Sequence, residues 1–313
     1  MGIPAEKKAV ACESLVKNQL FEIMQREPLL SVFIPTYNYG RFLGEAVESV
    51  LSQNFGDFEL FVIDNASTDE TRDVMQKYKD TRVEFIVNPR NLGQGYSFDL
   101  FLKKARGRYL RALCADDVLI PDVLEEQVKA LNRYRTVGLV NCDMIETDER
   151  LENRKLTKCY PGFENGQIVA AYTLHIVRNA IGIPSSYMYH REAAQRMKLD
   201  SSYNYVGDLK IAIDLLQGRD YLNIDRPGFY YRRHGATSTV VDTNDSAKSE
   251  EWFRLVKEYD QFCHLSCWRL LRMPLAARRK LELLGWLARH LFDRKSIQSS
   301  FKARKKAWVN ANR

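Results

Sequence analysis

Short apolar runs alternate with helical patterns through the first half of the chain. Five runs are rich in β-branched and aromatic residues, and they are residues 29–35, 59–64, 82–87, 108–114 and 136–143. Each run is too apolar for a strand with one solvent-exposed face, which is typical of parallel strands covered by helices on both sides. The pattern therefore predicts a mainly parallel, covered sheet within residues 29–143.

Amphipathic patterns lie between or after these runs, in residues 42–53, 67–79, 97–105 and 121–134. The second of these segments opens with Ser67 and Glu70, which have the spacing of a capping box. The fourth has Pro121 at its start, where a helix tolerates proline. Strands that alternate with helices predict an α/β, doubly wound, Rossmann-like sheet covered by helices.

Three polar clusters follow predicted strands. PTYN ends the first strand, DNAS ends the second, and CADD ends the fourth. In open α/β sheets, ligands bind beyond the carboxyl ends of the strands. We therefore expect the three clusters to share one edge of the sheet and to form a binding site there.

The CADD cluster places two carboxylates, Asp116 and Asp117, next to each other at a strand end. Their mutual repulsion costs free energy, and a divalent cation removes that cost while leaving room for phosphate oxygens. The alternative is that they cap the helix predicted to begin at Pro121; one carboxylate can do so, but two seldom do. The sequence favours a diphosphate site that uses Mn²⁺ or Mg²⁺.

Charge narrows the choice of partners. The 313 residues carry a formal net charge of +7, which favours polyphosphates, anionic membranes or nucleic acids. Basic residues crowd the segment 268–313, where Leu and Trp recur at helical spacing. Such a helix would make peripheral contact with an anionic membrane, or would pack on the catalytic domain or on a second subunit in a homo-oligomer. No nucleic-acid-binding motif accompanies the charge, so nucleic acid is not an expected partner.

The N-terminal segment lacks the uninterrupted apolar core of a secretory signal, because Lys7, Lys8, Glu13 and Lys17 break it up. The chain contains no run of about eighteen uncharged apolar residues, which is the length needed to cross a bilayer. We therefore expect a cytoplasmic protein, either free or peripheral on the inner face of the membrane. Its six cysteines have no convincing metal-site spacing and are expected to be reduced thiols.

With these residues in view, the segment 30–234 resembles a glycosyltransferase of family 2 with a GT-A fold. Five ordered stretches carry the resemblance: SVFIPTYNYGRFLGEAVESVLSQNFGDFELFVIDNASTDET, NPRNLGQG, CADDVLIPDVLE, NYVGDLKIAIDLLQGRDY and YYRRHGATS. The resemblance implies inverting transfer of a sugar from a nucleotide-sugar donor, with UDP- or dTDP-sugars expected. The acceptor would be a hydroxyl of a glycan or a lipid-linked molecule, in bacterial surface polysaccharide synthesis.

The resemblance also implies roles for individual residues. The donor nucleoside would contact the PTYN loop and the end of the second strand, namely Pro35, Thr36, Tyr37, Asn38, Asp64 and Asn65. Asn65 replaces the usual second Asp, although its carbonyl can accept a hydrogen bond from a pyrimidine imide. Asp117 would be the direct metal ligand, and Asp116 would contact the ribose or a water. Cys114 stands where many members carry a first Asp.

Four further residues match family positions. Arg90, Arg233 and His234 would lie near the diphosphate, with an ordinary surface arginine as the alternative for Arg90. Asp208 would be the general base that takes the proton from the acceptor hydroxyl. Its alternative role is that of a helix N-cap, because it precedes an apolar helical pattern.

The expected domain organisation follows from these assignments. Residues 1–28 would form a helical extension, and residues 29–240 a GT-A catalytic domain. Within that domain, residues 29–143 would bind the nucleotide-sugar and residues 144–240 the acceptor. Residues 241–313 would form a basic, helical C-terminal region.

Other classes fit less well. A dinucleotide enzyme needs G-x-G-x-x-G after the first strand, whereas this chain has PTYNYG. A sugar nucleotidyltransferase would carry a glycine-rich loop with Arg and Lys in that place. A non-catalytic scaffold for anionic lipid or polymer would have no use for Asp117 and Asp208. These last two classes remain the alternatives to a glycosyltransferase.

Overall fold

The computed structural model describes residues 27–175, 178–197, 200, 202–203, 205–235 and 245–259. Nearly all of the expected N-terminal extension, and the basic segment from Trp268 onward, lie outside these residues. None of the helices in the described part has the length and apolar character needed to cross a lipid bilayer.

The five predicted strands are all present, as β1 (Leu30–Thr36), β2 (Phe58–Asp64), β3 (Val83–Val87), β4 (Tyr109–Ala112) and β6 (Val137–Thr147). Further strands are β5 (Val118–Leu119), β7 (Lys155–Thr157), β8 (Phe163–Asn165), β9 (Met188–His190) and β10 (Asp220–Arg232). They form one sheet in the order β3-β2-β1-β4-β9-β6-β10-β5, with β7 beside β6 and β8 beside β10. β9 runs antiparallel between β4 and β6, while β1, β2, β3 and β4 pair in parallel, as do β6 and β10. The expectation of a mainly parallel sheet is confirmed.

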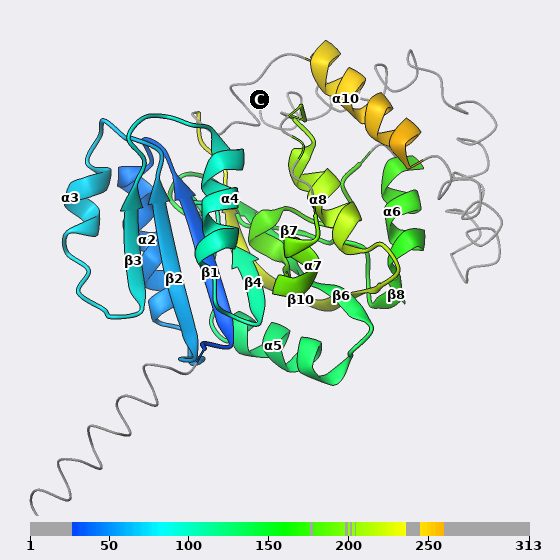
Figure 1. The fold of residues 1–313 in the computed structure, drawn as a ribbon, viewed down its shortest axis with the longest axis horizontal. Coiled ribbons are helices and arrows are strands. Elements are labelled where there is room, and N and C mark those ends of the chain that lie inside the picture. Colours follow the sequence, from blue (N-terminus) through cyan, green and yellow to red (C-terminus); the bar gives the residue numbers. More distant parts are fainter. Residues whose placement is uncertain are drawn as a thin grey trace, which may run out of the picture.

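Helices cover both faces of this sheet (Figure 1). They are α2 (Gly40–Leu51), α3 (Thr71–Met75), α4 (Gln94–Lys104), α5 (Val123–Arg133), α6 (Gly166–His175), α7 (Arg191–Gln195), α8 (Gly207–Leu215) and α10 (Asp245–Glu258), with a 3₁₀ turn, η1 (Pro184–Ser186). Figure 1 shows α4 in front of the strands and α2 behind them.

Two apolar cores result, because neighbouring strand residues point to opposite faces. Val32 and Ile34 of β1 pack with α2, α3 and α5, whereas Phe33 packs with α4, α6, α8 and α10. The ring of Phe33 stacks on that of Phe101 in α4, with centroids 4.8 Å apart. Burial on both faces explains why these strands lack a polar alternation.

The predicted capping box at Ser67 and Glu70 is wrong. The Ser67 hydroxyl donates to Asp64 Oδ1 at 2.5 Å instead, and α3 begins only at Thr71. Asp69 takes the capping role, since its Oδ1 accepts from the Thr71 backbone N–H at 3.1 Å and from the Thr71 hydroxyl at 2.6 Å. The buried carboxylate at the end of β2 needs donors, and Ser67 is the nearest hydroxyl.

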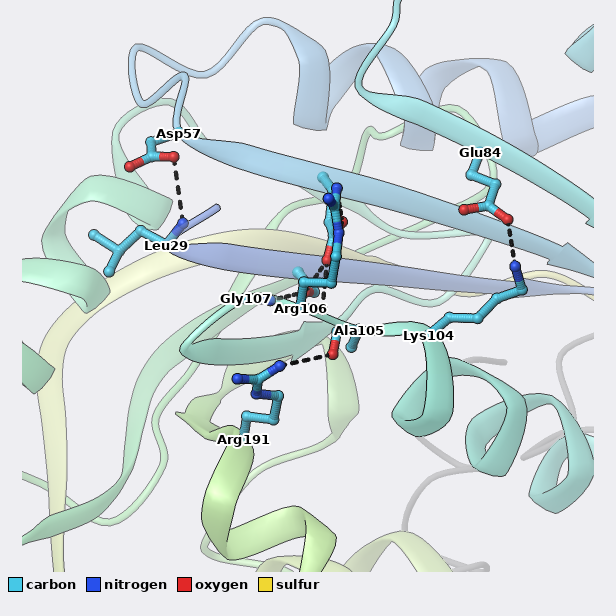
Figure 2. Close-up of polar contacts among 10 residues, drawn as sticks. Leu29, Asp57, Glu84, Lys104, Ala105, Arg106, Gly107 and Arg191 are labelled. Atoms are coloured by element: carbon cyan, nitrogen blue, oxygen red, sulfur yellow. Dashed lines mark hydrogen bonds and ion pairs between the residues drawn. The ribbon is translucent and has the colours of Figure 1, made fainter. Parts of the chain in front are cut away.

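A polar network fixes the amino ends of β1, β2 and β4, at the opposite edge from the three predicted clusters (Figure 2). Glu59 Oε1 accepts from the Ser31 hydroxyl and from the Arg106 backbone N–H, both at 2.7 Å. The Gly107 N–H donates to Ser31 Oγ at 2.8 Å, and a Cβ on Gly107 would lie only 2.4 Å from Ser31 N. This close approach sets the start of β4, and with it the place where the CADD segment emerges.

Candidate active site

The PTYN, DNAS and CADD segments meet at one edge of the sheet, as predicted. β1 lies between β2 and β4, so the carboxyl ends of the three strands are neighbours. The Asn65 N–H donates to Thr36 O at 2.9 Å, and the Asn38 N–H donates to Ser67 Oγ at 2.8 Å. These bonds join the first two segments into one rigid floor.

One of the two carboxylate oxygens of Asp64, at the edge of this floor, accepts no hydrogen bond from the described residues. Its Oδ1 accepts from the Ser67 N–H at 2.9 Å and from the Ser67 hydroxyl at 2.5 Å. Its Oδ2 is buried and accepts no hydrogen bond from the described residues, with Arg72 Nε 3.8 Å away. The buried hydroxyl of Thr36 likewise has no partner among those residues. Buried polar atoms normally have partners, so this pair indicates a place for a polar ligand.

The Asn65 side chain has a different role from the predicted contact with a pyrimidine base. Its Oδ1 accepts from Asn88 Nδ2 at 3.1 Å and from the Leu92 N–H at 2.9 Å, which uses both lone pairs of the amide oxygen. Its Nδ2 donates to Asn91 Oδ1 at 2.7 Å. The structure therefore does not offer the Asn65 carbonyl to a pyrimidine base, and the side chain instead anchors the loop that follows β3. Arg90 is exposed on that same loop.

The remaining residues of the PTYN loop are placed around this floor. Pro35 lies in β1 opposite Ile63, and Tyr37 is 43% exposed. Asn38 adopts a positive φ of 57°, and its Oδ1 accepts from the Thr68 N–H at 2.8 Å. The Tyr37 side chain is thus partly presented to solvent on the loop that follows β1.

Cys114, Asp116 and Asp117 form an acidic cluster, in which one ligand atom from each lies within 4.8 Å of the others. Neither carboxylate caps α5, because β5 intervenes and Asp122 occupies the N-cap position. The capping alternative for this pair is therefore wrong. Two carboxylates and a thiol are a donor set that can hold a divalent cation.

The electrostatics of the cluster agree with that use. Burial, followed by the charge of Asp116, raises the pKa of Asp117 well above its usual range. Burial also raises the pKa of Asp116, against the lowering effect of its hydrogen bond to His234. Burial and the charges of both carboxylates raise the pKa of the Cys114 thiol. Like charges held out of water in this way are stabilised when a cation neutralises them.

Residues from distant parts of the chain hold Asp117 in place. The Ser185 hydroxyl donates to Asp117 Oδ2 at 2.5 Å and accepts from the Cys114 N–H at 2.9 Å. The buried guanidinium of Arg111 donates to the Ser185 carbonyl and to Gln127. Sequence reasoning missed Ser185 and Arg111, because neither belongs to a recognisable motif.

The end of β10 closes over the cluster, but not as the sequence suggested. His234 Nε2 lies 3.1 Å from Asp116 Oδ2, whereas Arg233 Nε pairs with Glu146 Oε2 at 3.2 Å. Arg232 approaches the cluster instead: its backbone N–H donates to Asp117 Oδ1 at 3.2 Å, and its charge lowers the pKa of Asp116 and of Asp117. The Arg232 side chain itself pairs with Glu45 Oε2 at 2.8 Å, so its direct contact with Asp117 is made by the backbone.

The contacts of His234 define its tautomer. Arg41 Nη2 lies 3.4 Å from His234 Nδ1, and a guanidinium can only donate. Nδ1 therefore accepts, and Nε2 carries the proton that is donated to Asp116. Tyr39 also faces the cluster, since burial and then the charge of Asp116 raise the pKa of its phenol.

Asp208 lies in the first turn of α8. The N-cap of α8 is Val206, so the capping alternative for Asp208 is wrong. Part of the residue reaches solvent, but protein surrounds its carboxyl group, and this burial raises the pKa of Asp208. After burial, the charge of Asp208 is the next cause that raises the pKa of Tyr187, and it also contributes to the raised pKa of Cys114. The fold therefore brings Asp208 near the acidic cluster.

The family model described as glycosyl transferase family 2 matches residues 31–197. An uncharacterized glycosyltransferase, MJ1057 of Methanocaldococcus jannaschii, is 38% identical over 118 residues, which are 36% of this chain and 41% of that protein. The putative teichuronic acid biosynthesis glycosyltransferase TuaG of Bacillus subtilis is 36% identical over 105 residues, 33% of this chain and 42% of its own. An uncharacterized glycosyltransferase of Nostoc sp., alr2836, is 28% identical over 249 residues, 74% of either chain. The matches to MJ1057 and TuaG thus span about two fifths of those proteins.

Two solved structures show the same fold. TarS 1–349 of S. aureus, in complex with UDP-GlcNAc, has a TM-score of 0.61 at 18% identity, covering 83% of this chain and 72% of that one. The mannosyltransferase PcManGT of Pyrobaculum calidifontis, in complex with GDP-Man and Mn²⁺, has a TM-score of 0.54 at 16% identity, covering 92% of this chain and 76% of its own. Together with the sheet order, these likenesses show a GT-A fold.

Proposed function

The chain belongs to glycosyl transferase family 2, and from this premise we propose that it is an inverting glycosyltransferase. The donor is a nucleoside diphosphate sugar, with UDP- and dTDP-sugars as the first candidates. The acceptor is a hydroxyl group of a glycan or of a lipid-linked molecule. The resemblance to TuaG supports a role in surface polysaccharide synthesis.

A single arrangement carries this proposal: the fold brings Asp208, at the start of α8, near the acidic cluster of Cys114, Asp116 and Asp117. Inversion requires the acceptor oxygen to attack from the side opposite the leaving diphosphate. Asp208 would accept the hydroxyl proton on the acceptor side, and its raised pKa makes it a stronger base than an exposed Asp. On the donor side, the buried carboxylates lie where the diphosphate would leave.

The donor set at the cluster fits Mn²⁺ or Mg²⁺, because both prefer carboxylate oxygens. Asp117 and Asp116 would hold the ion, beside Cys114, and the ion would supply positive charge against the leaving diphosphate. The His234 Nε2–H donates a hydrogen bond to Asp116 Oδ2, and this bond would keep the carboxylate oriented toward the metal site. Asp117 would be the direct metal ligand, as the family resemblance implies.

The nucleoside would bind on the floor formed by β1 and β2. Asp64 Oδ2 and the Thr36 hydroxyl are buried and have no hydrogen-bond partner among the described residues, so they could bind polar groups of the nucleoside. The exposed Tyr37 ring would supply an apolar surface for the base. Residues 29–143 would thus bind the nucleotide-sugar and residues 144–240 the acceptor. Arg90 lies exposed on the loop after β3, and its proposed role is to close over the diphosphate when the donor binds.

The test is a donor screen. The purified protein is incubated with a panel of nucleotide-sugars and Mn²⁺, with and without EDTA, and released nucleotide is measured. We expect release of a nucleoside diphosphate from one class of donor, loss of that release in EDTA, and an inverted anomeric configuration in the product by NMR. Pyrophosphate release in a parallel assay with nucleoside triphosphates and sugar 1-phosphates would identify a sugar nucleotidyltransferase instead, and no turnover in either assay would favour the scaffold. A product of retained configuration would refute the role of Asp208.

A further inference from the structure

The start of α8, which carries Asp208, is held by a residue of α10. The carboxylate of Glu251 is buried, and its Oε2 accepts from the Tyr205 N–H at 2.7 Å and from the Val206 N–H at 3.2 Å. Val206 is the N-cap of α8, and only Gly207 separates it from Asp208. Glu251 therefore binds the backbone directly in front of the proposed base.

This contact replaces a missing local cap. No side chain caps α8 at its N-cap position, and the N–H groups at a helix start have no partner within the helix. In a capping box, a Glu three residues into the helix would bond the N-cap N–H. Here a Glu from another helix does so, 45 residues along the chain. Gly207 adds backbone freedom at this point, which makes an outside anchor more important.

A second set of contacts keeps α10 against α8. Lys210 Nζ lies 2.8 Å from Glu258 Oε1 and 3.1 Å from both the Tyr259 hydroxyl and Asp214 Oδ2. On the apolar side, Trp252 and Leu255 of α10 belong to the same buried core as α8. The position of Glu251 is thus fixed by packing and by charge, independently of its own bond to α8.

We propose that Glu251 is a positioning residue for the transfer reaction, acting through Asp208. By holding the Tyr205 and Val206 amides, it sets the direction in which the first turn of α8 presents the Asp208 carboxylate to the acceptor hydroxyl. The inference rests on the proposed function, in which Asp208 is the base. It also means that the chain beyond residue 240 takes part in catalysis through α10.

The first experiment compares Glu251→Ala with Glu250→Ala, an exposed neighbour on the same helix. A misplacement of about 1 Å in a reacting group can cost about 10²-fold in rate, so we expect kcat of Glu251→Ala to fall by about that factor. The KM for the donor and the affinity for nucleotide with Mn²⁺ should stay unchanged, because α8 contributes none of the proposed donor contacts. Glu251→Gln keeps an acceptor oxygen and should recover most of the lost rate. Glu250→Ala should behave like the wild type.

A double-mutant cycle then separates positioning from general stabilisation. If Glu251 acts through Asp208, Glu251→Ala should cause no further loss of kcat in an Asp208→Asn background. Equal losses in both backgrounds, or a lowered melting temperature with normal kcat, would overturn the inference. Should Glu251→Ala fail to fold, the same cycle is run with Glu251→Asp, whose shorter side chain draws the carboxylate back from the Tyr205 and Val206 amides, and full additivity there counts against the inference equally. A wild-type rate for Asp208→Asn would instead show that the proposed base is wrong.

Discussion

Asp208→Asn is the most informative single substitution in this protein. The Asp208 carboxylate accepts a hydrogen bond from the Leu209 N–H, at 2.7 Å to Oδ1. The amide oxygen of Asn can accept the same bond, and the two side chains have nearly the same shape. The substitution therefore removes the ability to take a proton while leaving the local structure in place.

The expected effect on rate is large. Loss of a general base typically lowers turnover by about 10²–10⁴-fold, which corresponds to about 2.7–5.5 kcal/mol in the activation free energy at about 1.36 kcal/mol per tenfold. If Asp208 served only as a cap, the loss would be about 1 kcal/mol of stability and little rate. The two roles thus predict damage in different measurements.

The loss of a helix cap would lower stability, whereas Asp208→Asn should leave the stability unchanged or raise it. Burial raises the pKa of Asp208 above its ordinary value of 3.8. For such a carboxyl, the contribution to stability is fully present below the unfolded pKa and is lost as the pH rises through the folded pKa. At neutral pH the ionised group therefore costs free energy, and a neutral Asn should leave the melting temperature unchanged or raise it.

The assay combines three measurements on the wild type and Asp208→Asn. Calorimetry with nucleotide and Mn²⁺ should give equal affinities, and thermal melting should give equal or higher stability for the variant. Initial transfer rates of the wild type should rise with pH through the raised pKa of Asp208, because a base must be deprotonated, and this rise should vanish in the variant. A variant with normal kcat and a lower melting temperature would refute the assignment of Asp208 as base.

Three further predictions concern the acidic cluster and the C-terminal segment. Asp117→Asn should abolish transfer with the fold intact, and excess EDTA should do the same to the wild type; substantial turnover in either case would contradict the metal assignment. Ser185→Ala removes the donor to Asp117 Oδ2, so it should cost about 1.5–3 kcal/mol of stability and raise the Mn²⁺ concentration needed for half-maximal rate. Ser186→Ala, whose hydroxyl bonds Ile183 O, is the control, and equal Mn²⁺ requirements in both variants would count against the role of Ser185. Removal of the chain from Trp268 onward should leave a folded protein that no longer co-sediments with anionic vesicles at low salt, whereas unfolding would show that the segment belongs to the core.

The sequence by itself determined the elements and the edge of the sheet where they place their polar ends. Strands buried on both faces need continuous apolar runs, which is why β1, β2, β4 and β6 could be predicted within a few residues. β3, a partly exposed edge strand, was predicted from its apolar run as well. Asp64, Asp116 and Asp117 lie at or just after strand ends, so their gathering could also be expected from the rule for open α/β sheets. Asp208 begins a helix, and its assignment came from the family resemblance.

Only the tertiary structure decided which side chains complete the site. The backbone N–H of Arg232 donates to Asp117 Oδ1, while the Arg232 side chain pairs with Glu45 and that of Arg233 with Glu146. The Asn65 amide is hydrogen-bonded to the loop after β3, and the Ser185 hydroxyl donates to Asp117, which lies 68 residues away in the chain. Such pairings depend on sheet order and on the packing of helices against it. They join residues far apart in the chain, so no local spacing or periodicity in the sequence records them.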